Sequence, residues 1–403
     1  MFLEIIAVVF LGCILGVVTG LTPGLHINLV AVILFGVSPL LLGYTNAVVL
    51  ASFIIAMSIT HTFTDFISSV YLGAPSDDTA LSVLPGHRML LEGKGHEAVK
   101  LTVIGSLLAL IFSILLVPLL VIAVPFIFEN VKSYVGWILI AIISFMIWRS
   151  ENWNLRFWSL IVYLISGIFG IIVFGMPNLK DPLLPMLSGL FGISGLLMSL
   201  SEKVSLPIQR DTDSIEVSNK EIVKSIGSSI FSGSIVSIFP GLGPAQAAVL
   251  GSQIVGKISM FGFFILVGGI NTVSMIMSLV TLFTIEKARN GSIVIVQKLL
   301  ESIDFNVFAS FIAIALVAGG IASFFALKTS KIFSKIINKV NYKLLSILII
   351  IFVCSLVFYF TGFIGMLILC VSTSIGIIPA VLNVNRSNLM GCLLMPVILY
   401  YLI

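Results

Sequence analysis

The chain has 403 residues, of which 59% are hydrophobic and only 9% charged, and its formal net charge is +4. A soluble domain carries about 25% charged residues, so the composition excludes a soluble enzyme, a nucleic-acid-binding protein and a disordered chain. The four cysteines lie in apolar runs without a CxxC pair, as is typical of buried small side chains. The chain is therefore predicted to be a polytopic membrane protein.

Apolar stretches near 20 residues recur along the chain, and this length fits membrane helices rather than the short strands of an outer-membrane barrel. The first stretch, 5–21, has no basic residue before it, so it is expected to be a membrane element and not a removable signal peptide. The predicted fold class is all-α, with about 12–14 membrane helices or re-entrant arms. The segments fall at 4–20, 25–43, 45–72, 101–128, 131–148, 155–175, 183–200, 223–239, 242–260, 262–285, 306–327, 344–361, 364–382 and 388–403.

Polar loops are predicted at 73–100, 201–222, 286–305 and 328–343. The last of these contains five lysines and no acidic residue, and an excess of basic residues is typical of cytoplasmic loops. Alternate crossings counted from this loop put most of the 21 Lys and Arg residues on the cytoplasmic side. The sequence therefore predicts a multi-pass protein of the cell (cytoplasmic) membrane with its N-terminus outside.

A short motif occurs twice, just over half the chain apart. Residues 20–28 read Gly-Leu-Thr-Pro-Gly-Leu-His-Ile-Asn, and residues 237–246 read Ser-Ile-Phe-Pro-Gly-Leu-Gly-Pro-Ala-Gln. An odd number of predicted crossings separates the two Pro-Gly pairs, as in inverted-topology repeats. The predicted organisation is a first membrane repeat at 1–200, a cytoplasmic linker at 201–222 and a second membrane repeat at 223–403.

Each Pro-Gly pair interrupts an apolar region, and irregular backbone at membrane depth is tolerated only inside protein or beside a watery cavity. A helix that begins after such a break offers free N–H groups and a positive dipole end to an anion. Two ordinary tight turns at the membrane surface are the alternative. The predicted substrate-binding residues are Thr22, Pro23, Gly24, Asn28, Pro240, Gly241, Gly243, Gln246, Asn271 and Thr272.

Two ionisable residues, His61 and Asp65, lie four positions apart in the apolar segment 45–72, so they share one face of a helix. Ionisable groups in a bilayer cost about 2.5–3.5 kcal/mol each on insertion scales and usually face a cavity or each other. Together with Ser58 and Thr62, they are predicted to couple a proton or a sodium ion. A solvated helix end is the alternative.

The loop 73–100 contains a third group of polar residues. Its acidic residues can ligate a cation or cap a helix, and loop contacts to the substrate are predicted at Ser76, Asp77, Asp78, Thr79 and Arg88. The spacing of the His and acidic residues matches no metal-ligand pattern, and the sequence shows neither a phosphate-binding P-loop nor a nucleophile elbow. We therefore expect no metal, no cofactor and no catalytic residue.

In their order, these motifs resemble the TctA family, the large membrane subunit of tripartite tricarboxylate transporters, and especially its shorter stand-alone archaeal-type members. The family has a G-x-x-P-G-L turn, a G-x-P-(S)-x-x-x-T-A stretch and a P/D-G-x-x-M motif, which correspond here to 20–25, 73–80 and 85–89. Its basic K-x-G-x-E-A stretch corresponds to 94–98, which is one residue shorter, and its P-G-x-G-x-x-x-A turn corresponds to 240–247. The resemblance covers 1–105 and 225–285 well and the rest by hydropathy. It implies a membrane transporter for an organic anion.

This sequence departs from the family pattern in two places. A glycine-rich polar stretch of the family is here Ser58–Asp65, with two ionisable residues in it, and the paired asparagines after the second turn are reduced to Asn271. Specificity for citrate or another tricarboxylate is therefore not carried over. Neither is a requirement for a periplasmic binding protein and a small membrane subunit.

The predicted function is an ion-coupled secondary transporter of a small organic anion, with a carboxylate preferred. The expected partners are the substrate, a coupling proton or sodium ion and the lipid bilayer, with a homodimer left open and nucleic acid excluded. One alternative is a transporter or flippase of a lipid-linked phosphate such as polyprenyl phosphate, because helix dipole ends bind phosphate equally well. The others are a non-catalytic assembly subunit and an intramembrane enzyme with His61 and Asp65 as acid and base.

Overall fold

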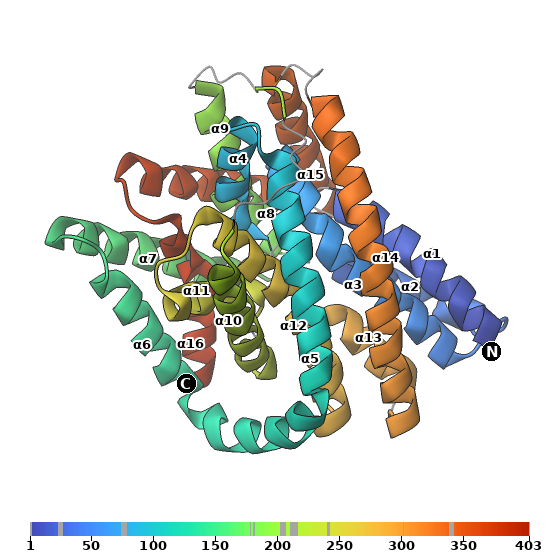
Figure 1. Cartoon of the computed structure of the whole chain (residues 1–403). Coiled ribbons are helices and arrows are strands. Elements are labelled where there is room, and N and C mark those ends of the chain that lie inside the picture. Colours follow the sequence, from blue (N-terminus) through green and yellow to red (C-terminus); the bar gives the residue numbers. More distant parts are fainter. Residues whose placement is uncertain are drawn as a thin grey trace.

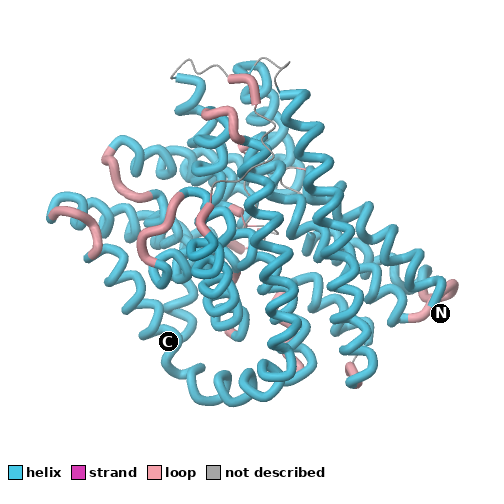
Figure 2. The backbone as a smooth tube through the Cα atoms, viewed as in Figure 1, coloured by secondary structure: helices cyan, strands magenta, loops and turns pink. Residues whose placement is uncertain are grey.

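The computed structural model describes residues 2–22, 27–73, 79–177, 179, 182–201, 207–209, 217–239, 242–300, 302–337 and 342–402. Helices linked by loops make up this part of the chain, and it contains no β-strand (Figures 1 and 2). Seven helical stretches in the described ranges are long and apolar enough to cross a membrane. The predicted all-α polytopic membrane fold is thereby confirmed.

Nine α-helices precede the polar region around residue 207. They are α1 (Phe2–Leu21), α2 (Ile27–Leu41), α3 (Ala47–Leu72), α4 (Val83–Leu91), α5 (Gly95–Val131), α6 (Val135–Trp148), α7 (Trp153–Phe174), α8 (Leu183–Leu187) and α9 (Ser194–Ser201) among the described residues. A π-helical segment, Ser188–Ile193, joins α8 to α9. Short 3₁₀ turns, Ala80–Ser82 and Lys132–Tyr134, precede α4 and α6.

The helices after this region follow a similar order. They are α10 (Asn219–Ile238), α11 (Pro244–Val255), α12 (Met260–Ile285), α13 (Gly291–Leu300), α14 (Phe305–Ile337), α15 (Tyr342–Val381) and α16 (Gly391–Leu402), with the 3₁₀ segment Arg386–Met390 before α16. Gly362 breaks α15 with a φ of 64°, which matches the boundary predicted between segments 344–361 and 364–382.

The lengths of α1–α5 recur in α10–α14. Helices α1 and α10 have 20 residues each, and α3 and α12 have 26 each. In both groups a short helix lies between these two, and another short helix and a long helix follow. Each helical group thus has the same succession of elements.

Helices α3 and α12 form the buried centre of the bundle. Within their apolar windows, 83% and 89% of the residues are buried. Helix α1 packs on α3 and α10 packs on α12, whereas the long helices exchange partners: α5 packs on α12 and α14 packs on α3. The two halves of the chain therefore share one interlocked core.

The ends of the two central helices are defined by their sequence. Helix α3 begins at Asn46, whose Oδ1 accepts a hydrogen bond from the Val49 amide at 3.0 Å, and ends at Gly73 in the left-handed region. The N-cap of α12 is Ser259, whose Oγ accepts a hydrogen bond from the Gly262 amide at 3.2 Å. Side-chain caps of this kind satisfy amides that a helix leaves unpaired.

Two of the polar regions read from the sequence as loops contain helices. Helix α4 lies within 73–100 and α13 lies within 286–305, and α14 continues through Ile337 into the lysine-rich region. Hydropathy misses α4 and α13 because they are too short to span a bilayer and alternate apolar with polar residues. In Figure 1, α4, α9, the C-terminal end of α14 and the start of α15 gather at one end of the bundle, while α13 lies at the other.

Close contact between α5 and α12 depends on two glycines. A methyl group added at Gly105 would overlap the Ile265 carbonyl, and one added at Gly268 would overlap the Thr102 carbonyl. The Ser106 Oγ donates a hydrogen bond to the Gly268 carbonyl at 2.9 Å. Glycine at these positions therefore allows the two helices to approach at backbone distance.

We expect Gly268→Ala to destabilise the protein by about 1–3 kcal/mol, the usual cost of overpacking a filled interior. The matched control is Gly320→Ala in α14, because an added methyl group there meets no atom within 4 Å and alanine favours helix formation. Thermal melting of both variants in detergent checks this prediction. Equal melting temperatures for the two variants would contradict it.

Candidate functional site

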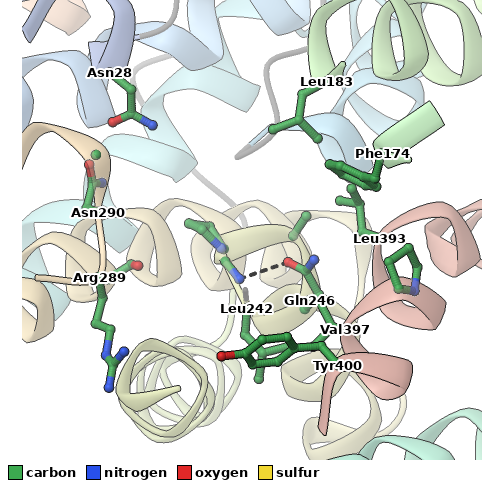
Figure 3. A pocket seen from close by; sticks show the side chains of 16 residues that line it. Asn28, Phe174, Leu183, Leu242, Gln246, Arg289, Asn290, Leu393, Val397 and Tyr400 are labelled. Atoms are coloured by element: carbon green, nitrogen blue, oxygen red, sulfur yellow. Dashed lines mark hydrogen bonds between the residues drawn. The ribbon is translucent and has the colours of Figure 1, made fainter. Parts of the chain in front are cut away.

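A cavity of about 570 Å³ lies at the N-terminal end of α11 (Figure 3), and we call it the Arg289 cavity. Polar residues approach it from α2, α11, α12 and the loop between α12 and α13, and apolar residues close it on the side of α7, α8 and α16. The lining residues are Asn28, Phe174, Leu183, Leu242, Gly243, Pro244, Ala245, Gln246, Ser274, Arg289, Asn290, Gly291, Leu393, Pro396, Val397 and Tyr400.

The first turn of α11 faces this cavity. Pro244 occupies the first helical position, where its missing N–H costs nothing. The side chain of Gln246 turns back on the helix start, and its Oε1 accepts a hydrogen bond from the Gly243 amide at 3.0 Å. The positive end of the α11 dipole is therefore directed at a cavity large enough for a small ligand.

Arg289 lies on the opposite side of the cavity from Phe174 and Leu183 (Figure 3). Its backbone amide and that of Asn290 both donate to the Ser278 Oγ, at 3.1 and 2.9 Å, which fixes the loop on α12. The guanidinium carbon is 5.3 Å from the centroid of the Phe128 ring, a distance at which a cation is attracted to an aromatic face.

The guanidinium of Arg289 is a half-buried positive charge. Its Nε and Nη2 atoms are buried and have no hydrogen-bond partner in the described part of the chain, and no acidic side chain is among the described residues that line the cavity. Burial lowers the pKa of Arg289, but an arginine in a protein stays protonated. The cavity thus carries a cation with unused donors, which is suited to an anionic ligand.

Asn28 links the first half of the chain to the second at the wall of the cavity. Its Oδ1 accepts a hydrogen bond from the Ser292 amide at 3.0 Å, in the first turn of α13. Gly291 is required beside it, because a methyl group there would lie 2.6 Å from the Asn28 Cγ. The side chain of Asn28 therefore holds α2 against α13.

A second polar group lies where α3 crosses α12. The Oδ2 atom of Asp65 accepts a hydrogen bond from the Asn271 Nδ2 at 2.9 Å, and the hydroxyl oxygens of Thr62 and Thr272 are 3.3 Å apart. Asp65 is only 3% exposed and Asn271 2% exposed. This arrangement places the carboxyl group inside the protein, at the contact between the two central helices, and not at a solvated helix end.

His61 belongs to the same buried region, on the side of α1. Its Nδ1 is 3.0 Å from the Thr19 Oγ1, at hydrogen-bond distance. Two turns further along α3, the Ser68 Oγ donates to the Gly20 carbonyl at 3.1 Å. The hydroxyl of Ser58 is buried and has no hydrogen-bond partner within the described residues. His61 and Ser68 therefore lie beside the last turns of α1.

The cavity and the buried polar group are neighbours along α12. Ser274 lines the cavity and lies three residues after Asn271, a rise of about 4.5 Å along a helix. Its Oγ accepts a hydrogen bond from the Ser237 Oγ of α10 at 2.9 Å. A movement of α12 at Asn271 would therefore also move the cavity wall.

The structure distributes the sequence-predicted site residues over several places. Asn28, Gly243 and Gln246 line one cavity, whereas Asn271 and Thr272 contact Asp65 and Thr62 instead. Thr22 follows α1 and is not among the residues that line the Arg289 cavity, and its Oγ1 donates to the Val18 carbonyl of α1 at 2.7 Å. The described residues do not include Pro23, Gly24, Ser76, Asp77, Asp78, Pro240 and Gly241.

Thr79 and Arg88, which were predicted as loop contacts to the substrate, do not line the Arg289 cavity. The carbonyl of Thr79 accepts a hydrogen bond from the Ser82 Oγ at 2.7 Å in the 3₁₀ turn, and Arg88 lines a different cavity. No group of three or more His, Cys, Asp or Glu residues that could hold a metal ion occurs in the described ranges.

Sequence reasoning missed Arg289. It counted only among the Lys and Arg residues of the polar loops, because nothing in the linear pattern links it to the Pro-Gly motifs. The signal that could have found it is its place just before Asn290-Gly291-Ser292, a turn-forming stretch that can begin a helix.

Comparison with known proteins identifies related sequences. A family model described as the tripartite tricarboxylate transporter TctA family matches residues 6–391. A protein of Methanocaldococcus jannaschii, described as "Uncharacterized protein MJ1079", is 33% identical over 402 residues, which cover 97% of this chain and 98% of that protein. No solved structure matches the chain.

Proposed function

The chain belongs to the tripartite tricarboxylate transporter TctA family, and from this premise we propose that it is an ion-coupled secondary transporter of a small organic anion that carries a carboxylate group. TctA is a family of transporter components, and the seven apolar helices make the chain a multi-pass membrane protein. The substrate class, the coupling ion and the residues that bind them are the proposal.

The observation that carries the proposal is the positive charge of the Arg289 cavity. Arg289 lines the same cavity as the N-terminus of α11, and its Nε and Nη2 atoms are buried and have no hydrogen-bond partner in the described part of the chain. Taking an arginine out of water without an anion is costly. A bound carboxylate would supply both the counter-charge and the missing hydrogen-bond acceptors, and guanidinium groups hold carboxylates in a bidentate manner.

Two features support an arrangement in inverted repeats, at 1–200 and 223–403, joined by a linker at 201–222. The helix lengths of α1–α5 recur in α10–α14, and α5 and α14 exchange partners between α12 and α3. In addition, α2 contacts α13 of the other half, and α11 contacts the 3₁₀ turn before α4. Transporters with such repeats bind substrate at the repeat interface, near discontinuous helices.

Asp65 is the proposed coupling residue. A bare carboxylate is disfavoured by burial, so Asp65 would bind a proton or a cation in each transport cycle. The Asp65 oxygen that accepts from Asn271 lies at the crossing of α3 and α12. Neutralisation there would change the contact between the central helices of the two halves, about one turn from the cavity wall at Ser274. His61, Ser58 and Thr62 would complete the ion site.

We also propose that α4, α9 and the adjoining ends of α14 and α15, which lie together in Figure 1, face the cytoplasm, with the N-terminus outside. The lysines near the adjoining ends of α14 and α15 motivate the orientation. Glu92 is an exposed residue between α4 and α5, so Glu92→Cys reports on this end. The thiol should react with an impermeant maleimide only in inverted vesicles, and reaction in intact cells would reverse the orientation.

The proposed function is tested with purified protein reconstituted into vesicles. Uptake of radiolabelled citrate, succinate and acetate is measured under imposed sodium and proton gradients, and polyprenyl phosphate is tested for binding by thermal shift. Gradient-driven accumulation of at least one carboxylate is expected. Stabilisation by polyprenyl phosphate without any carboxylate uptake would replace the proposal by transport of a lipid-linked phosphate. Absence of binding and uptake altogether would favour an assembly subunit.

A further inference from the structure

A second cavity, of about 740 Å³, is lined by residues of α4, α9 and α11 among others, and α4 and α9 lie together at one end of the bundle (Figure 1). We call this second cavity the Arg386 cavity. It is enclosed by α4, the π-helical segment, α9, α11, the start of α12 and the 3₁₀ segment before α16. The polar and charged residues that line it are His87, Arg88, Ser252, Gln253, Ser259, Asn385, Arg386 and Ser387.

Arg386 projects a guanidinium among weak hydrogen-bond acceptors. Its Nη1 donates to the Ser194 Oγ at 3.5 Å and its Nη2 donates to the Met198 sulfur at 3.1 Å. No acidic side chain is found among the described residues that line this cavity. A hydroxyl and a thioether do not balance the charge of a guanidinium, because they are neutral and the thioether accepts only weakly.

The other ionisable groups in this cavity leave its net charge positive. Burial lowers the pKa of Arg386 to about 10, so its side chain is charged at neutral pH. Burial lowers the pKa of His87 to about 4, so His87 is neutral there and adds no charge. Arg88 supplies a second cation at the exposed edge. At neutral pH the described lining therefore carries two positive charges.

Helix α11 connects the Arg386 cavity with the Arg289 cavity. Residues 243–246 at its start line the Arg289 cavity, and Val249, Ser252 and Gln253 toward its end line the Arg386 cavity. The stretch from 386 to 400 also contributes to both cavities, with Arg386 at one and Tyr400 at the other. A helix of 12 residues is about 18 Å long, so the two cationic cavities lie at opposite ends of one short helix.

A smaller cavity of about 480 Å³ adjoins the Arg386 cavity and shares Met146, Ser252, Gln253 and Asn385 with it. Arg149 lines this smaller cavity, and its Nη1 donates to the Gln253 Oε1 at 3.0 Å. The side chain of Gln253 thus lies between Arg149 and the Arg386 cavity. Glu151 also lines this smaller cavity, so the charges of Arg149 and Glu151 balance and the smaller cavity adds no net positive charge to the Arg386 cavity.

We propose that the Arg386 cavity is a second binding site for a small carboxylate anion, at the opposite end of α11 from Arg289. The identity of the anion rests on the proposed function, since both cavities would serve one transported substrate. The positive charge of the cavity and its preference for anions follow from Arg386 and Arg88 alone. The substrate would then pass from one arginine to the other along α11.

The test measures charge preference directly and needs no transport. Ser252 faces the cavity from α11 and bonds only to its own helix, through the Val249 carbonyl at 2.7 Å, so Ser252→Cys is a mild reporter. The half-exposed and exposed cysteines, Cys354 and Cys370, are first replaced by serine. The purified full-length protein is then treated with an anionic methanethiosulfonate that carries a sulfonate and with a cationic one that carries trimethylammonium.

We expect the sulfonate reagent to modify Ser252→Cys about tenfold faster than the cationic reagent, because the positive charge of the cavity attracts the first and repels the second. Both rates are first divided by the rate of the same reagent with a free thiol. Arg386→Gln should bring the ratio close to one. The matched control is Arg156→Gln, which removes an arginine that lies over Trp148 and Trp153 outside the cavity and should leave the ratio unchanged.

Protection by added anions identifies the ligand. Citrate or succinate should slow the modification of Ser252→Cys, and Arg386→Gln should abolish this protection. A ratio of the two reaction rates near one for Ser252→Cys, in protein that keeps Arg386, would overturn the proposal, whatever the uptake assays show. Protection by inorganic phosphate but by neither carboxylate would overturn the assignment of the ligand. If the protein accumulates no carboxylate in the uptake assays but the two reagents react at the expected ratio, the proposed function alone would be contradicted.

Discussion

Arg289→Gln is expected to lower carboxylate uptake at least about tenfold, because hydrogen bonds to a charged group contribute about 1.5–3 kcal/mol. Glutamine keeps a polar side chain but removes the only cation among the described residues that line the cavity. The α11 N-terminus and Gln246 remain, so weak binding of the anion should persist. The expected change is therefore a large increase in the KM for uptake.

A second variant separates the bidentate geometry of the Arg289 contact from its positive charge. Arg289→Lys keeps the positive charge but loses the planar fork that binds a carboxylate in a bidentate manner, and we expect it to fall between the wild type and Arg289→Gln. Lys287→Gln is the matched control, since Lys287 lies in the same loop and its Nζ is 4.6 Å from the Phe128 ring centroid. It does not line the cavity.

Uptake is measured in vesicles with the carboxylate that the wild type accumulates best, and thermal melting checks that each variant is folded. A KM for Arg289→Gln within twofold of the wild-type value would remove this residue from the substrate site. Equal losses in Arg289→Gln and Lys287→Gln would attribute the effect to the general positive charge around Phe128, which Lys132 also approaches at 5.9 Å.

Much of the fold could be predicted from the sequence, since apolar stretches of membrane length are a strong signal. The boundaries expected for 45–72 and 262–285 agree with α3 and α12 within two residues. The same signal failed for α4 and α13. These helices do not cross a bilayer, so only the packing of the surrounding helices determines their conformation, and that packing involves residues far apart in sequence.

The candidate site was predictable only in part. Asp65 stands out in the sequence, because an acid in an apolar segment is expensive. Its partner Asn271 is 206 residues away, and the sequence placed Asn271 with the substrate instead. Arg289 and Arg386 lie in polar stretches where arginine is common, so their burial beside cavities could be found only once α11, α12 and α16 were placed in space.

Asp65→Asn is expected to abolish gradient-driven accumulation while leaving substrate exchange intact. Asparagine has nearly the same shape and can still accept a hydrogen bond from the Asn271 Nδ2, which the carboxyl group now does at 2.9 Å. It can neither bind a proton nor supply a charge for a sodium ion. The fold and the Arg289 cavity should therefore persist, and only the coupling to the ion gradient should be lost.

The other residues of this buried group serve as comparisons. His61→Ala should shift the pH dependence of uptake, because it removes an ionisable ring that lies 3.0 Å from the Thr19 hydroxyl. Ser52→Ala is the matched control on the same helix, since Ser52 is buried and donates only to the Val48 carbonyl of α3, at 2.7 Å. Its accumulation and its pH dependence should resemble those of the wild type.

Accumulation under imposed sodium or proton gradients and counterflow exchange without a gradient are measured on the same vesicles. Loss of both in Asp65→Asn, in protein that melts normally, would make Asp65 part of the substrate site instead of the coupling site. Unchanged accumulation by Asp65→Asn would show that Asp65 does not couple transport to the ion gradient. Its buried contact with Asn271 would then serve to hold α3 against α12. Loss of accumulation alone is the result that an ion-coupled carrier requires, because exchange moves substrate down its own gradient and needs no net movement of the ion.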